Sequence, residues 1–144
     1  MTGCRKVFVD TAPFIYYIEK DENHPLYFEK VKNFFRECYE NGIEVVSSVI
    51  TVEDYLVFPY RIQAQCYVDM FYKLIETVDM DIMEINQEIA KKAAKIRAEY
   101  KGFKGMDALQ LASACLADCD MFLTNDKQLK QFRELTCITV EDLE

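Results

Sequence analysis

The chain has 144 residues, 51% of them hydrophobic, and a formal net charge of −8 at pH 7. This length excludes two ordinary domains, and the composition excludes an intrinsically disordered protein. The acidic balance excludes binding of nucleic acid through a broad basic surface, but it allows a nuclease whose acids hold a metal ion. No apolar run reaches the roughly 20 residues of a membrane helix, and the N-terminus lacks a signal peptide's apolar region. We expect one domain over residues 1–144, in the cytoplasm and without membrane association.

The first elements form a strand and two helices. Arg5 to Val9 reads as a buried strand that ends in Asp10, and Thr11 is suited to cap a following helix. After a polar break, an amphipathic helix runs from Leu26 to Cys38 and ends at Asn41-Gly42. Asp10 is thus expected at a strand-to-helix turn.

The middle of the chain continues the alternation. Residues 43–48 read as a second strand, followed by a short helix that bears Glu53 and that we expect Pro59 to end. Another amphipathic helix carries apolar residues between Cys66 and Ile75. Residues 78–83 alternate apolar and polar side chains, as in an edge strand.

The last third begins with a helix capped by Asn86, and a glycine-containing turn at 101–105 precedes an alanine-rich helix over Met106 to Leu116. Met121 to Thr124 reads as a strand, and Cys137 to Val140 as the final one. Alternating strands and helices predict an α/β fold in three layers, α/β/α, with a mostly parallel sheet covered on both faces.

The six cysteines are scattered and form no Cys-x-x-Cys pair, and His24 is the only histidine. Zinc sites in proteins are usually built from clustered cysteine and histidine ligands. The pattern therefore disfavours a zinc site and favours reduced thiols packed within apolar elements.

Four acids stand beside apolar elements: Asp10, Glu53, Asp107 and Asp126. An ionised carboxylate near a core is costly unless it is paired or metal-bound, and a divalent cation removes the repulsion between several of them. Oxygen ligands of this type suit Mg²⁺ or Mn²⁺. Asp107 also has a simpler explanation, because carboxylates stabilise the first turn of a helix.

The blocks around these acids resemble those of the PIN-domain family. They are Val9-Asp10-Thr11, Val52-Glu53, Gly105 to Ala114 with Asp-Ala-Leu-x-x-Ala-x-Ala inside it, and Leu123-Thr124-Asn125-Asp126. Their order and spacing match over nearly the whole chain, and the length is similar to that of the VapC-type toxins of prokaryotic toxin–antitoxin pairs.

This resemblance implies a PIN-like fold and a metal-dependent ribonuclease, often dimeric and inhibited by a cognate antitoxin. Asp10, Glu53, Asp107 and Asp126 would be the catalytic and metal-binding acids, with Mg²⁺ or Mn²⁺ as cofactor. Thr124 would supply a hydroxyl that orients a carboxylate. Lys127 stands where some relatives carry a further acid, which leaves the number of metal ions open.

Cations close to these acids are candidates to hold the RNA backbone. Six cations and one acid lie between Lys91 and Lys104, and Lys127 directly follows Asp126. Lys104 and Lys127 are the predicted substrate-binding residues. The alternative is a solvated helix face.

Other readings remain at this stage. A haloacid-dehalogenase-type phosphatase would need a second aspartate where Ala12 stands, and the lysine and acidic pair of a receiver domain are not evident. A PIN fold kept only for binding RNA or protein is the non-enzymatic alternative. Several tyrosines on the helices could belong to the core, to a homodimer face or to an antitoxin groove.

Overall fold

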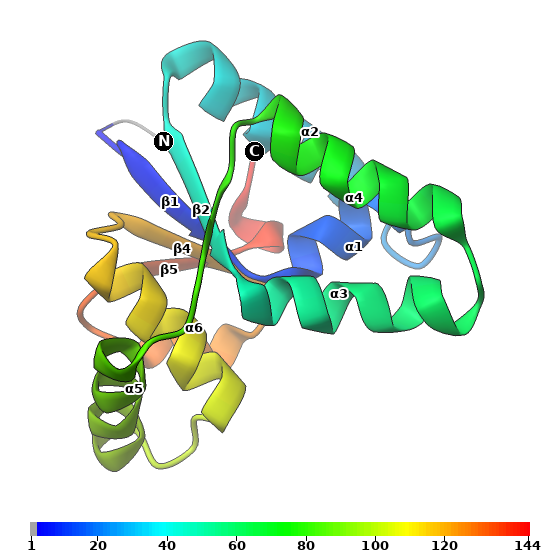
Figure 1. Ribbon diagram of the computed structural model, residues 1–144. Helices are drawn as coiled ribbons and strands as arrows, with labels where there is room; N and C mark the ends of the chain where they lie inside the picture. The colour runs from blue at the N-terminus through cyan, green and yellow to red at the C-terminus, as the bar shows by residue number, and fades with distance from the viewer. Residues whose placement is uncertain (1–2) are drawn as a thin grey trace.

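The computed structural model describes residues 3–144; Met1 and Thr2, in the segment expected to lack a signal peptide, lie outside them. A five-stranded sheet lies between two layers of helices, so the expected α/β/α architecture is confirmed (Figure 1). In chain order the elements are β1 (Lys6–Val9), α1 (Thr11–Glu19), α2 (Pro25–Asn41), β2 (Glu44–Ser48), α3 (Val49–Arg61), α4 (Gln65–Thr77), β3 (Asp81–Met83), α5 (Gln87–Glu99), α6 (Gly105–Leu116), β4 (Met121–Thr124), the 3₁₀ helix η1 (Lys127–Gln131), β5 (Thr136–Thr139) and the 3₁₀ helix η2 (Val140–Asp142).

All the strands are parallel, in the order β3-β2-β1-β4-β5. The chain builds outward from β1 to β3 and then crosses back to place β4 on the other side of β1. In open sheets of this kind, ligands bind outside the carboxyl ends of the strands where the order reverses. That point lies between β1 and β4, where Val9 pairs with Leu123 and Asp10 N donates to Leu123 O at 2.9 Å.

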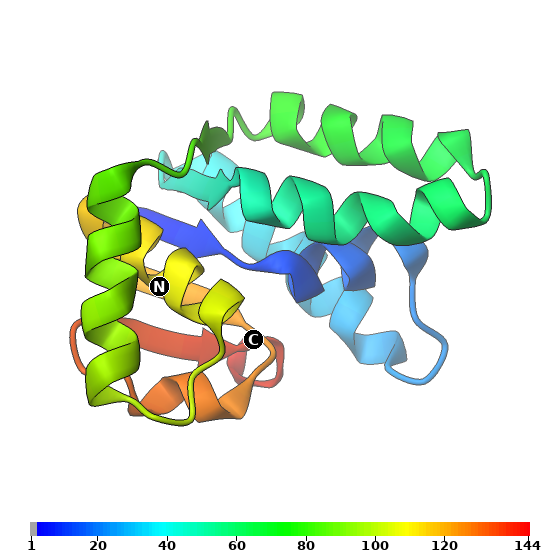
Figure 2. The same cartoon turned by 60° about the horizontal axis from the view of Figure 1, so that its bottom comes forward.

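The two faces of the sheet carry separate cores because successive side chains of a strand point in opposite directions. Val7 and Val9 pack with buried residues of α1 to α4. Phe8 points the other way, stacks on Phe122 with ring centroids 5.2 Å apart, and packs with α5, α6 and η1. Figure 2 shows these two groups of helices on either side of the strands.

The expected end of α3 at Pro59 is wrong, because the helix continues to Arg61 with Pro59 inside it. Proline removes one backbone donor from the helix. Here the loss falls in the last turn, and the carbonyls of Phe58 and Pro59 still accept bonds from Ile62 N at 3.1 Å and Ala64 N at 2.9 Å.

The other element predictions agree with the structure to within a few residues, although the predicted strand at 78–83 shortens to β3. All six cysteines are free thiols. Within residues 3–144, none of the helices combines the length and apolarity needed to span a bilayer.

Candidate metal centre

A hollow of 450 Å³ lies at the carboxyl ends of β1 and β4, at the reversal of strand order. Four carboxylates from four parts of the chain line it: Asp10, Asp54, Asp107 and Asp126. They follow β1, stand in α3, begin α6 and follow β4. The crossovers of the parallel sheet therefore bring together acids that lie far apart in the sequence.

Asp10 is the most constrained of the four. Its Oδ1 accepts from Thr11 N at 2.9 Å and from Gln110 Nε2 at 3.3 Å, and its Oδ2 accepts from the Thr124 hydroxyl at 2.9 Å. Burial raises the pKa of Asp10 above its ordinary value, and these hydrogen bonds oppose that rise. Asp10 is thus held in one orientation at the end of β1.

Asp107 lies in the first turn of α6, as the sequence predicts. Burial raises its pKa, and the negative charges of Asp10, Asp126 and Asp54 raise it further, while Lys104 lowers it. This set of neighbours shows that the hollow concentrates negative charge. Capping of α6 therefore does not account for the whole environment of Asp107.

Thr124 and Asp126 form the β4 side of the hollow. The Thr124 side chain is buried, and its oxygen bridges Asp10 Oδ2 and the backbone N–H of Asp126, at 3.2 Å from the latter. Asp126 caps η1 by accepting from Gln128 N at 3.0 Å. Thr124 thus ties the ends of β1 and β4 together at the level of the acids.

The structure does not bring Glu53 to the hollow, and its neighbour Asp54 stands there instead. Successive residues of an α-helix point about 100° apart. Thr51 and Tyr55 are buried on the inner side of α3, so Asp54 lies beside that face while Glu53 is turned away. The burial of Thr51 and Tyr55 shows which face of α3 points inward, so the tertiary structure and not the sequence separates Asp54 from Glu53.

Comparison with known proteins gives the family of this fold. The family model described as PIN domain matches residues 7–135. The chain belongs to the PIN-domain family. Among curated protein sequences, none matches it.

Solved structures resemble this PIN domain at low sequence identity. A DNA-bound VapBC complex from Salmonella typhimurium has a TM-score of 0.74 at 15% identity, with 94% of this chain and 98% of the other covered. FitAcB from Neisseria gonorrhoeae gives 0.73 at 16%, covering 95% and 99%. VapC20 from Mycobacterium tuberculosis, a sarcin-ricin-loop-cleaving toxin, gives 0.62 at 13%, covering 81% and 86%. At identities this low, the structural similarity shows a shared fold.

The donor chemistry of the PIN-domain hollow suits a hard divalent cation. Its four carboxylates offer oxygen ligands only. Burial raises the pKa values of Asp10 and Asp107, and the neighbouring carboxylates raise the pKa of Asp107 further, an effect that a bound cation would oppose. Among residues 3–144, no group of three or more His, Cys, Asp or Glu side chains is drawn together as a ready-formed metal cluster. The residues fit Mg²⁺ or Mn²⁺ in kind.

The two predicted substrate-binding lysines differ in their surroundings. Lys104 immediately precedes α6, and its positive charge acts on Asp107. Lys127 begins η1 and forms an ion pair with Glu141 at 3.2 Å, so its charge is partly balanced within the protein. Lys91 and Lys92 are also paired, with Glu88 and Glu134. Lys104 is therefore the cation with the clearest link to the acids.

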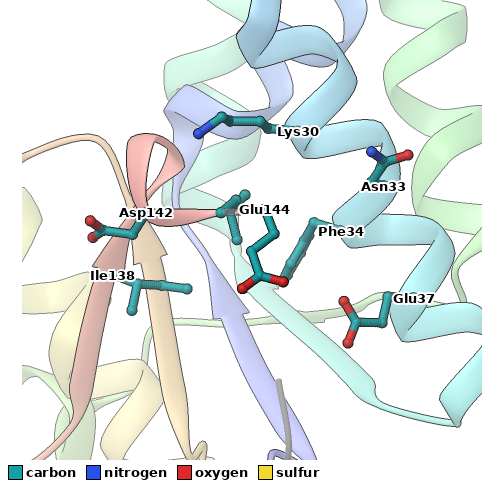
Figure 3. A pocket seen from close by; sticks show the side chains of 8 residues that line it. Lys30, Asn33, Phe34, Glu37, Ile138, Asp142 and Glu144 are labelled. Carbon is teal, nitrogen blue, oxygen red and sulfur yellow. The ribbon is translucent and has the colours of Figure 1, made fainter.

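A second hollow, of 290 Å³, lies between α2 and the C-terminal residues (Figure 3). Lys30 and Asn33 line it from α2, and Asp142 and Glu144 line it from the C-terminal end of the chain. Lys30 Nζ donates to Glu141 O at 2.8 Å, and Asp142 pairs with Lys130 at 2.7 Å. The first contact joins α2 to η2 and the second joins η1 to η2, and none of the four converging acids lines this hollow.

Proposed function

We propose that this PIN domain, over residues 1–144, is a metal-dependent endoribonuclease and the toxin of a toxin–antitoxin pair. The observation that carries the proposal is the convergence of Asp10, Asp54, Asp107 and Asp126 on one hollow at the reversal of strand order. The charges of Asp10, Asp126 and Asp54 act together on the part-buried Asp107, which favours a shared cation over four separate caps. Cellular RNA as substrate implies action in the cytoplasm.

The roles of the residues follow from their positions. Asp10, Asp54, Asp107 and Asp126 would hold Mg²⁺ or Mn²⁺, and Thr124 keeps the Asp10 carboxylate in place by donating to its Oδ2. A divalent cation supplies, when bound, a water of lowered pKa and stabilisation of charge on a phosphate. We assign to Asp54 the role expected for Glu53.

Histidine chemistry does not compete at this hollow. His24 stacks on Tyr27, with ring centroids 4.6 Å apart, and is not one of the lining residues. Without a histidine pair, the 2′-hydroxyl of RNA is not the expected nucleophile. Cleavage by water leaves a 5′-phosphate and a 3′-hydroxyl, whereas 2′,3′-cyclic phosphate products would contradict this assignment.

The comparisons support the biological setting of the proposal. VapC20 is a toxin that cleaves the sarcin-ricin loop, and other structural neighbours are toxin–antitoxin complexes, one of them from Klebsiella pneumoniae. By analogy, we propose RNA as the substrate and an antitoxin protein as the partner of this chain. A small open reading frame beside its gene would support the pairing.

The surface for a partner is proposed on α3 and α4. Apolar side chains stand exposed at the end of α3 and along α4: Val57, Phe58, Tyr60, Ile62, Met70 and Tyr72. Several exposed apolar side chains on two neighbouring helices are a common feature of protein interfaces. We propose that they serve a homodimer or the antitoxin, and sedimentation of the isolated chain as a monomer at high concentration would exclude the homodimer.

The nuclease is tested with purified protein and a mixed cellular RNA pool, in Mg²⁺, in Mn²⁺ and in chelator, beside Asp10→Asn. We expect cuts at discrete positions that need metal and are lost in the variant. Equal cleavage by both proteins would mean a contaminating nuclease.

The alternative is a catalytically silent PIN fold that binds RNA or protein. Mn²⁺ titration separates the two proposals, because a silent module has no reason to keep four carboxylates for a cation. Saturable Mn²⁺ binding that is lost in Asp10→Asn favours the enzyme. Lack of binding and of cleavage favours the module.

A further inference from the structure

Gln110 is a polar side chain in a buried, largely apolar helix. It is 2% exposed on α6, whose other buried residues are mainly alanine and leucine. A buried primary amide is costly unless its donors and its acceptor are all bonded. A residue of this kind in an apolar helix therefore needs a structural reason.

The amide of Gln110 is bonded at both ends. Its Nε2 donates to Thr51 Oγ1 at 2.7 Å and to Asp10 Oδ1 at 3.3 Å, and its Oε1 accepts from the Ser48 hydroxyl. Ser48 also caps α3 by accepting from Ile50 N at 3.1 Å. One side chain on α6 thus contacts the residue that follows β1 and the start of α3.

These contacts lie one helical turn from two further acids. Gln110 stands three residues after Asp107 on α6, and Thr51 stands three residues before Asp54 on α3. Residues three apart share a helix face. The bond between Gln110 and Thr51 therefore sets α6 against α3 close to the points from which Asp107 and Asp54 reach the hollow.

We propose that Gln110 is a positioning residue that orients the Asp10 carboxylate and holds α3 and α6 in register, so that three acids of the metal centre stay preorganised. The inference rests on the proposed metal-dependent function. It assigns Gln110 no contact with substrate or metal. Its effect passes through Asp10 Oδ1 and through the spacing of the two helices.

No other side chain would make the same set of contacts as Gln110. A leucine or methionine would fill the space but leave the hydroxyls of Ser48 and Thr51 without their partner. A glutamate would place a second carboxylate against Asp10. After loss of the amide, Asp10 keeps its bonds from Thr11 N and Thr124, so the fold has other anchors while the carboxylate gains freedom.

The test compares Mn²⁺ binding by calorimetry in the native protein, in Gln110→Met and in Ser113→Ala. Ser113 is a matched control because it is buried on the same helix and its hydroxyl donates to Leu109 O at 2.8 Å, away from the acids. Loss of groups that orient metal ligands typically costs 10–100-fold in affinity. We expect the Kd for Mn²⁺ to rise about tenfold in Gln110→Met and to stay within about twofold in Ser113→Ala. Circular dichroism checks that both variants are folded.

A second measurement uses the native protein and does not depend on the folding of a variant. In ¹H–¹⁵N spectra, the side-chain amide pair of Gln110 should shift as Mg²⁺ is added and stop shifting at saturation. The amide pair of Gln87, exposed on α5, is the control that should stay unchanged.

The outcomes separate the inference from the proposed function. Native protein that binds Mn²⁺, together with an unchanged Kd in Gln110→Met and an unmoved Gln110 resonance, overturns the positioning role and leaves the metal centre intact. Native protein that binds neither cation overturns the metal centre itself, and the positioning role falls with it.

Discussion

The assignment of Asp54, and not Glu53, as a metal ligand can be tested directly, because the two adjacent carboxylates of one helix make a matched pair. We expect Asp54→Asn to weaken Mn²⁺ binding strongly and Glu53→Gln to leave it nearly unchanged. Both substitutions remove one negative charge from α3 and keep the size of the side chain. Of these two residues, Asp54 lines the hollow with Asp10, Asp107 and Asp126, and Glu53 does not.

The magnitude follows from the exposure of Asp54, which places it in a water-like dielectric. Two unit charges 4 Å apart interact by about 1 kcal/mol at the dielectric constant of water. A divalent cation doubles this to about 2 kcal/mol, and each 1.4 kcal/mol is tenfold in binding, so the Kd should rise about thirtyfold. Glu53 is solvated and turned away, and its neutralisation should change the Kd less than about twofold.

Calorimetric titration with Mn²⁺ measures both variants under one buffer, and RNA cleavage follows as a second readout. Thermal melting in chelator controls for folding. Equal losses of Mn²⁺ affinity in the two variants would mean that the net charge of α3 governs metal binding. A larger loss in Glu53→Gln than in Asp54→Asn would refute the helical-face argument.

Four further predictions concern pH, substrate, backbone and thiols. Burial and neighbouring charges raise the pKa values of Asp10 and Asp107, so the folded protein holds these protons more tightly than the unfolded chain. In chelator, the stabilising contribution of these protons is full below the ordinary aspartate pKa and is lost as pH rises through the raised values. The melting temperature of the native protein relative to that of Asp107→Asn should therefore fall over this range, and Mg²⁺ should reverse the relative fall. Lys104→Ala should lower the salt-dependence slope of RNA binding by about 0.7, whereas a slope as steep as native would show that Lys104 touches no phosphate. Gly42 ends α2 at a φ of 65°, so Gly42→Ala should cost roughly 1–2 kcal/mol in the free energy of unfolding, and a smaller cost in urea titration would mean that the turn relaxes. Cys66 is exposed, while burial raises the pKa of the thiols of Cys38 and Cys119 to about 12, so maleimide should label Cys66 first, and a fast phase that survives in Cys66→Ser would disprove this order.

Local patterns in the sequence were sufficient to predict most of the fold. The apolar triplet Val7 to Val9 before Asp10 marks a buried parallel strand, and Asn41-Gly42 ends α2 because glycine adopts the left-handed backbone at low cost. The prediction that Pro59 ends α3 is wrong because a proline is tolerated when it falls near the end of a helix. That end is set by packing and by the backbone hydrogen bonds that Ile62 and Ala64 donate, which the local sequence does not show.

The sequence by itself determined the alternation of strands and helices and the placing of Asp10, Asp107 and Asp126 at strand or helix ends, since hydrophobic period and capping are local properties. Only the tertiary structure decided between Glu53 and Asp54 and showed the bonds of Gln110. The rotation of α3 about its axis is set by the packing of Thr51 and Tyr55 against distant elements. Gln110 contacts Asp10 only because β1, α3 and α6 converge at one edge of the sheet.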